Sequence, residues 1–209
     1  MYLALLAIAC LVLPWVARGE TEHGLWKSQQ IEMLYRGRIT MYDCDVLRHK
    51  VQQVLGTIGA HESTEVNTTN CSNLLLSANS SVQVATLHIS IVSPARVTPQ
   101  LRAELARDWS RQELLDRLGA KHVPSEEFPV YWRSVDVAGD ERLKLTARDC
   151  ELLQQLRKQV LPKLAVKVMA RDSHCSTSPQ RLRAPRLKIM ALMPVPSPDA
   201  IDNAHLETG

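Results

Sequence analysis

The residues of this chain whose types and spacing could do chemistry are two acidic clusters, each built around a cysteine. Asp43-Cys44-Asp45 is followed 106 positions later by Asp149-Cys150-Glu151. Paired carboxylates can perform general acid–base catalysis, in which one group donates a proton and the other accepts it. Each cluster also precedes an amphipathic pattern, and negative charge is favourable at the N-terminus of a helix. We therefore interpret Asp43 and Asp149 as helix caps.

Other catalytic and cofactor-binding motifs are missing from the sequence. It contains no Gly-x-Ser-x-Gly nucleophile elbow, no P-loop, no Gly-x-Gly-x-x-Gly turn and no His-Glu-x-x-His zinc motif. The cysteines lack Cys-x-x-Cys spacing, which argues against a structural zinc ion. The sequence therefore predicts no catalytic residue, no metal site and no cofactor, so we expect that the protein is not an enzyme. A hydrolase without a recognisable motif is the remaining catalytic alternative.

The two cysteine clusters belong to a longer internal repeat. Alignment of residues 26–55 with residues 132–161 gives ten identities, and the rare residues tryptophan and cysteine are among them. A repeat of this length is the size of a domain and is longer than a solenoid unit. The alternative is two similar but independent strand–helix segments. The identical pairs are Trp26/Trp132, Ser28/Ser134, Arg36/Arg142, Thr40/Thr146, Asp43/Asp149, Cys44/Cys150, Leu47/Leu153, Gln53/Gln159, Val54/Val160 and Leu55/Leu161.

The N-terminal residues have the pattern of an export signal. Apolar residues run from Leu3 to Val16, too short a stretch for a comfortable membrane span, and Ala17-Arg18-Gly19 fits a small-residue cleavage site. Residues 1–19 are therefore predicted to be a signal peptide, and the mature protein to be periplasmic or secreted. No Lys or Arg precedes the apolar run, so the signal is atypical or the start lies upstream. Lipidation of Cys10 is an alternative, although the apolar run continues past it.

Removal of the signal leaves four cysteines, an even number that agrees with an oxidising compartment. Four cysteines allow three pairings, and the repeat favours the one in which each pair stays within its own half. The sequence thus predicts the disulfides Cys44–Cys71 and Cys150–Cys175. Each disulfide should tie the start of a helix to the loop between the last two strands of its half.

The first half reads as strand, helix, strand and strand. Apolar residues alternate from Ile31 to Met41 with an interruption at Gly37, which predicts one long strand or two shorter ones. Asp43 then begins a helix of about fourteen residues that ends at Gly59. A short strand is predicted over 62–68, followed by a loop that holds Cys71. The last strand is predicted over 82–92 and stops before Pro94.

The second half repeats this plan. A turn signal at Gly139-Asp140 predicts a hairpin, Asp149 begins a helix that Pro162 ends, and strands are predicted over 164–170 and 187–193. The fold class is therefore α+β, with two pseudo-repeated β(β)αββ halves, each an antiparallel sheet with one packed helix. Two linker helices should begin at Thr98-Pro99 and at Ser110. The predicted domains are a signal peptide (1–19), the first half (20–94), a helical linker (95–127), the second half (128–194) and a disordered tail (195–209).

Trp26 and Trp132 occupy matched positions where each half enters its first strand. A matched pair of this kind could line a groove between the halves, and core or interface packing is the alternative. The formal net charge of +3 gives no strong attraction to nucleic acid. A basic run ends in Arg186 and Lys188, but it lacks the interleaved aromatic residues of single-strand binders. We predict no nucleic-acid partner, and no transmembrane segment once the signal is removed.

The string from Tyr42 to Val51, the later Cys71-Ser72 and the string from Asp149 to Leu153 resemble a family of small exported proteobacterial proteins with a duplicated Asp-Cys-Asp/Glu helix motif. The resemblance covers most of the mature chain. It implies a periplasmic or secreted location and brings no activity, substrate or catalytic residue. The sequence therefore predicts a non-catalytic binding or structural accessory protein of the cell envelope, with an envelope protein or lipid as partner. The alternative is a small-ligand or lipid binder with a groove between the two halves.

Overall fold

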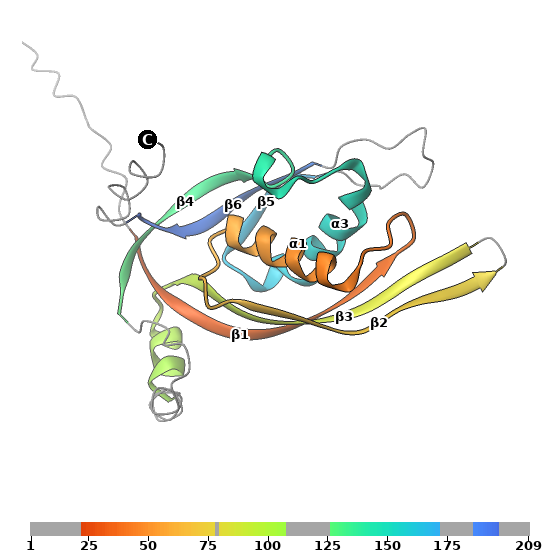
Figure 1. The fold of residues 1–209 in the computed structure, drawn as a ribbon. Coiled ribbons are helices and arrows are strands. Elements are labelled where there is room, and N and C mark those ends of the chain that lie inside the picture. Colours follow the sequence, from red (N-terminus) through yellow and green to blue (C-terminus); the bar gives the residue numbers. More distant parts are fainter. Residues whose placement is uncertain (1–21, 78–79, 108–125, 172–185, 197–209) are drawn as a thin grey trace, which may run out of the picture.

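The six described strands form one antiparallel sheet that curves around two helices (Figure 1). This computed structural model describes residues 22–77, 80–107, 126–171 and 186–196. The strand order in the sheet is β2-β3-β1-β4-β6-β5, so the fold is α+β, as predicted. The elements in chain order are β1 (Glu22–Gly37), α1 (Cys44–Thr57), β2 (Glu65–Ser77), β3 (Ser80–Arg96), a helix over residues 99–107, β4 (Phe128–Asp136), the 3-10 helices η1 (Glu141–Leu143) and η2 (Ala147–Asp149), α3 (Cys150–Gln159), the 3-10 helix η3 (Leu161–Lys163), β5 (Val166–Arg171) and β6 (Leu187–Pro194).

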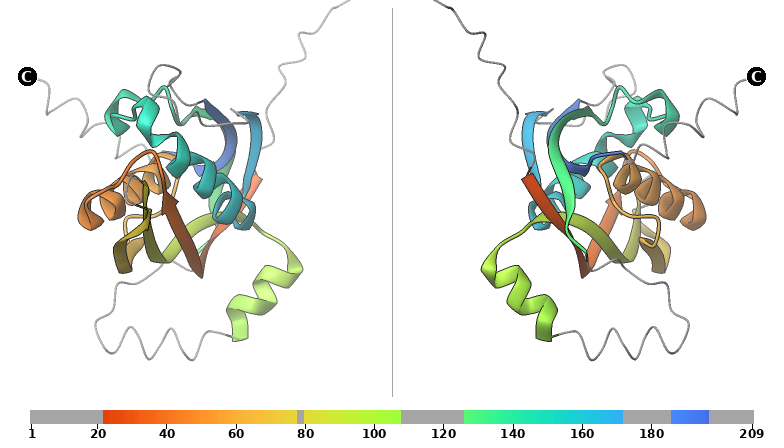
Figure 2. Two further views of the ribbon diagram at one scale, coloured as in Figure 1. Left: turned by 90° about the vertical axis from the view of Figure 1, so that its right-hand side faces the viewer. Right: turned by 90° about the vertical axis from the view of Figure 1, so that its left-hand side faces the viewer.

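Helices α1 and α3 lie on the concave side of the sheet, whereas the helix over residues 99–107 lies outside the curve (Figures 1 and 2). The core fills the space between the two helices and the sheet. Its side chains come from alternate positions of the long strands and from one face of each helix. The largest fully buried members are Met33, Tyr35, Leu47, Leu55, Leu87, Ile89, Ile91, Leu152, Leu156 and Ile189.

Helix α1 confirms the capping prediction for Asp43. The Asp43 side chain accepts a hydrogen bond of 2.9 Å from the backbone N–H of Asp45, which is otherwise without an intrahelical partner. Leu47 and Val51 are buried on the inner face of the helix. Gly59 has a φ of 92°, a left-handed conformation that glycine adopts without strain, so the chain can leave the helix here.

The sheet is continuous because β1 and β4 pair where each strand begins. Glu22–Gly24 pair with Phe128–Val130, and from there the two strands diverge within the described residues. On its other side β1 pairs with β3 from Gly24 to Gly37. The sequence predicts a separate sheet in each half, and in this respect it is wrong, because the pairing of β1 with β4 joins all the strands.

Strands β2 and β3 are longer than predicted. β3 continues past Pro94, which has no N–H to donate to a neighbouring strand. Val92 directs its N–H to the side of β2, where the hydroxyl of Thr64 accepts it at 3.2 Å. Backbone groups alternate, so the Pro94 nitrogen faces the same side, at a point beyond the start of β2 at Glu65. Proline therefore costs no ladder hydrogen bond at this position.

The hairpin predicted around Gly139-Asp140 does not form. After β4 the chain enters η1 and then η2, because local side chains satisfy the first N–H groups of each turn. Asp140 accepts from the N–H of Arg142 at 3.0 Å, and Thr146 accepts from the N–H of Arg148 at 3.3 Å. Leu143 is buried by these turns, so its apolar character does not mark a strand.

Helix α3 covers the backbone edge of β1 that β4 leaves open. The Gln159 amide accepts from the N–H of Leu34 and donates to its C=O, both at 2.9 Å. Gln155 does the same for Arg36, with both distances 2.8 Å. Each glutamine amide thus provides the donor and the acceptor that a paired strand would provide. These bonds connect segments more than 100 residues apart in sequence.

Removal of both glutamine amides should destabilise the protein. We expect the double variant Gln155→Ala/Gln159→Ala to lose about 2–4 kcal/mol of unfolding free energy, because four backbone groups of β1 lose their partners. Lys158→Ala is the matched control: Lys158 is exposed on the same helix and should change stability by less than about 0.5 kcal/mol. Urea unfolding at pH 7 measures the difference. Equal losses in the two variants would contradict the role assigned to the glutamines.

The first strand is displaced from its predicted position, because β1 begins at Glu22 and ends at Gly37, so that residues 38–41 are not part of a strand. α3, β5 and β6 agree with the sequence to within a few residues. Thr98 accepts from the N–H of Leu101 at 3.1 Å and so begins the helix over residues 99–107. The second predicted linker helix, the signal peptide and most of the tail lie outside the described residues. Every described helix falls short of the length and apolarity that crossing a membrane requires.

Candidate binding groove

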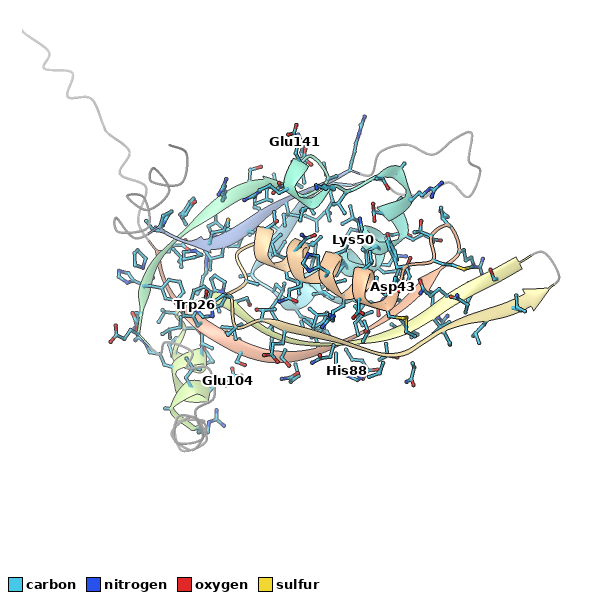
Figure 3. All side chains as sticks on the ribbon, viewed as in Figure 1. Trp26, Asp43, Lys50, His88, Glu104 and Glu141 are labelled. Carbon is cyan, nitrogen blue, oxygen red and sulfur yellow. A yellow bond between two sulfur atoms is a disulfide. The ribbon has the colours of Figure 1, made fainter. Side chains whose placement is uncertain are left out.

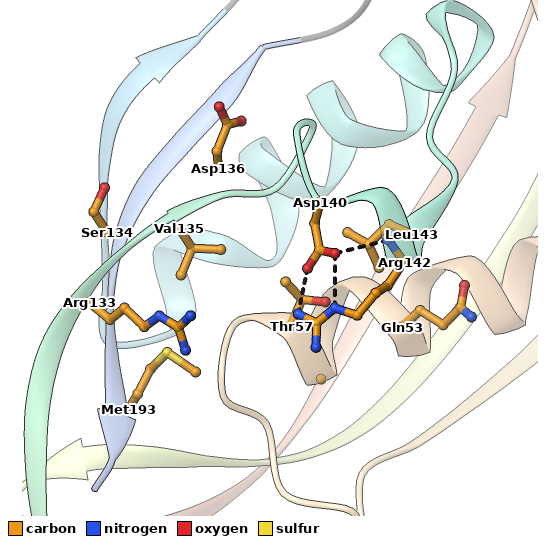
Figure 4. Close-up of a pocket in the computed structure, with 11 residues that line it drawn as sticks. Gln53, Thr57, Arg133, Ser134, Val135, Asp136, Asp140, Arg142, Leu143 and Met193 are labelled. Atoms are coloured by element: carbon orange, nitrogen blue, oxygen red, sulfur yellow. Dashed lines mark hydrogen bonds and ion pairs between the residues drawn. The ribbon is translucent and has the colours of Figure 1, made fainter. Parts of the chain in front are cut away.

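An open groove of about 470 Å³ lies between helix α1 and strand β4 (Figure 4). β4 pairs with β6 on one side and, in the described residues, with β1 only up to Val130 on the other. The groove opens beside the part of β4 that β1 no longer covers. Its walls are Gln53, Gly56 and Thr57 from α1, residues 133–136 from β4, Met193 from β6, and Asp140, Arg142 and Leu143 from the turns after β4.

Gln53 lines the groove with a half-buried side chain. It is the repeat-matched residue of Gln159, whose amide binds the backbone of Leu34 at the other end of the sheet. Within the described part of the chain, the Gln53 amide makes no hydrogen bond. A bound group with one donor and one acceptor would therefore find a ready partner at this position.

The charged residues of the groove differ in how they are paired. Asp140 and Arg142 bind each other through two hydrogen bonds, Nε to Oδ1 at 3.0 Å and Nη2 to Oδ2 at 2.7 Å. The pKa of Asp140 is lowered, chiefly by the hydrogen bond from Arg142. Asp136 lies 3.6 Å from Lys188. Arg133, whose side chain extends into the groove, makes no ion pair within the described residues (Figure 4).

A second, smaller cavity of about 420 Å³ lies where the helix over residues 99–107 meets the ends of β1 and β3. Two ion pairs span its walls. Arg96 contacts Glu22 at 2.8 Å, and Arg102 contacts Glu127 at 2.6 Å. These four charged side chains are therefore paired with one another.

Asp149 is the centre of a buried polar cluster that includes residues of both α1 and the segment before it. Its carboxylate accepts from the Tyr42 hydroxyl at 2.5 Å and from the Lys50 ammonium at 2.9 Å. The backbone N–H and the hydroxyl of Thr146 donate to its second oxygen at 2.6 and 2.9 Å. Lys50 and Asp43 lie on or beside the same helix (Figure 3), but only Asp149 of the two matched acids is buried.

The prediction that Asp149 caps α3 with its side chain is therefore wrong. Asp149 occupies the N-cap position of α3 but makes no side-chain hydrogen bond to that helix. The preceding turn η2 points the carboxylate inward, where it closes a capping box with Thr146. The repeat-matched Asp43 caps α1 and stays exposed.

The pKa values of Asp149, Tyr42 and Tyr35 are all shifted away from neutral pH, where acid–base catalysis requires them. Burial opposes the charge on Asp149, but the hydrogen bonds from Tyr42, Thr146 and Lys50 outweigh it and lower the pKa of the carboxyl group. Burial and the hydrogen bond to Asp149 raise the pKa of Tyr42, and burial with nearby carboxylates raises that of Tyr35. The carboxylate stays charged and the phenols stay protonated, so the cluster supports the fold.

These pKa shifts predict a loss of stability at both ends of the pH scale. Because the pKa of Asp149 is lower in the folded state than its ordinary value of 3.8, its stabilising contribution is complete above about pH 4 and is lost as pH falls. Because the pKa values of Tyr35 and Tyr42 are raised above 10.0, their contribution is present below about pH 10 and is lost as pH rises. Urea midpoints at pH 3, 7 and 10.5 measure both effects. An acid dependence that is unchanged in Asp149→Asn would contradict the assignment.

One of the two predicted disulfides lies within the described residues. Cys44 and Cys71 are bonded, with their Cα atoms 6.2 Å apart. Cys71 lies in strand β2 at a bulge between Thr69 and Ser72, whereas the sequence predicts a loop there. Cys150 is also disulfide-bonded. Its predicted partner, Cys175, lies outside the described residues, so this pairing stays a prediction.

The structure places the two matched tryptophans in separate surroundings. The Trp26 ring packs against Phe128, with ring centroids 4.7 Å apart, and against His61 at 4.9 Å. Trp132 lies under two cations, the Lys167 ammonium at 4.6 Å and the Arg96 guanidinium at 5.4 Å from its ring centroid. No described contact joins the two rings, and neither lines the groove of about 470 Å³.

Within the described residues, no group of three or more His, Cys, Asp or Glu side chains is arranged to hold a metal ion. Sequence reasoning misses Gln53 and Arg133 as groove residues. A signal exists for Gln53, because it is identical to Gln159 in the repeat. No protein-family model, curated protein or solved structure matches this chain.

Proposed function

We propose that this chain is an exported, non-catalytic binding or accessory protein of the cell envelope, and that the groove between α1 and β4 is its binding site. One observation carries the proposal: the half-buried Gln53 side chain lines an open groove, and its amide makes no hydrogen bond in the described part of the chain. An amide in an open groove is hydrated, and a bound ligand can replace that water with a donor and an acceptor of its own.

Export is supported by three features. The disulfide Cys44–Cys71 belongs to the type of bond that persists in oxidising compartments. The apolar run from Leu3 to Val16 fits a signal peptide, and the resemblance to exported proteobacterial proteins agrees with it. A periplasmic or secreted location follows from this proposal.

We further infer that the chain consists of two duplicated halves joined by a helical linker. The elements β1-α1-β2-β3 and β4-α3-β5-β6 have the same order in sequence. Read outward from the pairing of β1 with β4, the strand orders β1-β3-β2 and β4-β6-β5 are also the same. Cys44 and Cys150, both disulfide-bonded, are the first residues of α1 and α3. This equivalence supports halves at residues 20–94 and 128–194 and a linker at 95–127.

A small-ligand or lipid binder is the second candidate. The apolar side chains of Val135, Leu143 and Met193 favour it, because they line the groove and offer apolar surface for a ligand to cover. In both candidates the groove is the binding site, so one experiment tests them together.

Gly56 allows the groove to be blocked without damage to the fold. A side chain at Gly56 would meet no atom within 4 Å of its Cβ, and Gly56 lies in the last turn of α1. Gly56→Ala should stabilise the protein by up to about 1 kcal/mol because glycine is a poor helix former. Gly56→Trp should fold equally well and fill the groove.

We expect the immobilised wild-type protein and Gly56→Ala to retain the same component from a cell-envelope extract of the source organism, and Gly56→Trp to retain at least tenfold less. Protease treatment and solvent extraction of the retained component distinguish a protein partner from a lipid. Equal retention by all three proteins, or retention of nothing by any of them, would reject the groove as the binding site.

A further inference from the structure

Beside the groove, strand β4 presents backbone hydrogen-bonding groups for which the described residues provide no partner. Val137 donates its N–H to the C=O of Leu187 at 3.0 Å, so the odd-numbered residues at this end of β4 face β6. Backbone groups alternate along a strand, so the N–H and C=O of Trp132 and Ser134 and the N–H of Asp136 face the opposite side. On that side the described residues provide these groups with no hydrogen-bond partner.

We propose that the groove binds an extended, acidic peptide segment of a partner protein as an additional antiparallel strand on β4. Addition of a strand to an open sheet edge gives affinity through main-chain hydrogen bonds, and the adjacent side chains give specificity. The inference rests on the groove being the binding site and adds the chemical class of the partner.

The other end of the sheet shows how a helix can cover an open strand edge. There β1 lies between β3 on one side and the amides of Gln155 and Gln159 on the other. Gln53, the residue of α1 that aligns with Gln159, makes no such hydrogen bond to β4 in the described part of the chain. Among the described residues, the edge of β4 therefore stays available to a strand where the edge of β1 is covered by amides.

The acidic character of the segment follows from Arg133. Its guanidinium extends into the groove and makes no ion pair within the described residues (Figure 4). Directly opposed residues on antiparallel strands share one face of the sheet and interact. A carboxylate opposite Arg133 would neutralise its charge, and two positions away an apolar side chain would lie opposite Val135.

The probe is the peptide acetyl-Thr-Val-Thr-Glu-Thr-amide, aligned so that its Glu lies opposite Arg133 and its Val opposite Val135. On binding, we expect amide hydrogen exchange at Ser134 and Asp136 to slow at least threefold. N-methylation of the central Thr, whose N–H faces β4, should weaken binding at least tenfold. N-methylation of Glu, whose N–H faces away from β4, should change binding less than twofold. The substitution Arg133→Glu should weaken binding of the peptide at least tenfold. This variant should instead bind the analogue that has Lys in place of Glu more tightly than the parent peptide.

Two results would overturn strand addition. If both N-methylated peptides bind as tightly as the parent, the groove is a binding site but β4 does not pair with its occupant. If the peptide causes no change in exchange at millimolar concentration, the extended acidic segment is the wrong class of partner. In either case the proposed function is tested separately, by whether Gly56→Trp loses the envelope component that Gly56→Ala retains.

Discussion

Asp149→Asn is expected to lower the unfolding free energy by about 3 kcal/mol. Asp149 is 2% exposed, and its two oxygens accept from Tyr42, from Lys50 and twice from Thr146. Asparagine would replace one carboxylate oxygen with an NH2 group. That NH2 group is a hydrogen-bond donor and would face donors that now bind the oxygen. It would also leave the Lys50 ammonium, whose side chain is 19% exposed, without its counter-charge.

Asp43, which aligns with Asp149 in the sequence, supplies the matched control for this variant. It is exposed and caps α1 through one hydrogen bond. Asn is an N-cap residue as good as Asp, so Asp43→Asn should change stability by less than about 0.5 kcal/mol. Urea unfolding at pH 7 compares the two variants. Similar losses in both would mean that the buried cluster contributes no more than a helix cap.

Removal of the disulfide Cys44–Cys71 has the other large expected effect. The double variant Cys44→Ser/Cys71→Ser should lose about 3.5 kcal/mol, because the bond joins positions 27 residues apart and restricts the unfolded chain. The bond also holds the start of α1 against β2. The buried Gln83 amide adjoins it: its Nε2 lies 3.7 Å from Cys71 Sγ and donates to the C=O of Tyr42 at 2.5 Å.

Ser72→Ala is the control for the disulfide variant, since Ser72 is the exposed neighbour of Cys71 on β2 and should be nearly neutral. Reduction of the wild-type protein should cost at least as much as the double variant, because it also breaks the disulfide of Cys150. A loss below about 1 kcal/mol in urea unfolding would show that the unfolded chain gains little freedom when the bond is removed.

Local patterns predict those parts of the fold that depend on neighbouring residues. Asp43, the apolar positions Leu47 and Val51, and Gly59 together define α1, because capping, helical spacing and chain reversal are all properties of a short segment. The pairing of Cys44 with Cys71 follows from the repeat because equivalent cysteines serve equivalent positions. These predictions need no knowledge of how the strands meet.

Local patterns fail where two local signals compete and where a distant partner determines the structure. The apolar residues after Gly139 read as a strand, but capping bonds from Asp140 and Thr146 stabilise tight turns there. β3 continues through Pro94 because the nitrogen of Pro94 faces a side without a neighbouring strand. The turns after Gly139 arise from local capping bonds that compete with the apolar alternation of the segment. The course of β3, by contrast, is not visible in a window of sequence, since it depends on which edge of the strand is covered.

The sequence by itself determined the α+β class, the helix that Asp43 begins and the Cys44–Cys71 bond, because each depends on spacing that the chain carries locally or repeats. Only the tertiary structure decided the burial and the contacts of the residues that match in the sequence. Asp43 is an exposed cap and Asp149 a buried anion; Gln159 completes a sheet edge, and Gln53 lines an open groove. The physical reason is that the two strands diverge after a short pairing, so identical residues meet different partners.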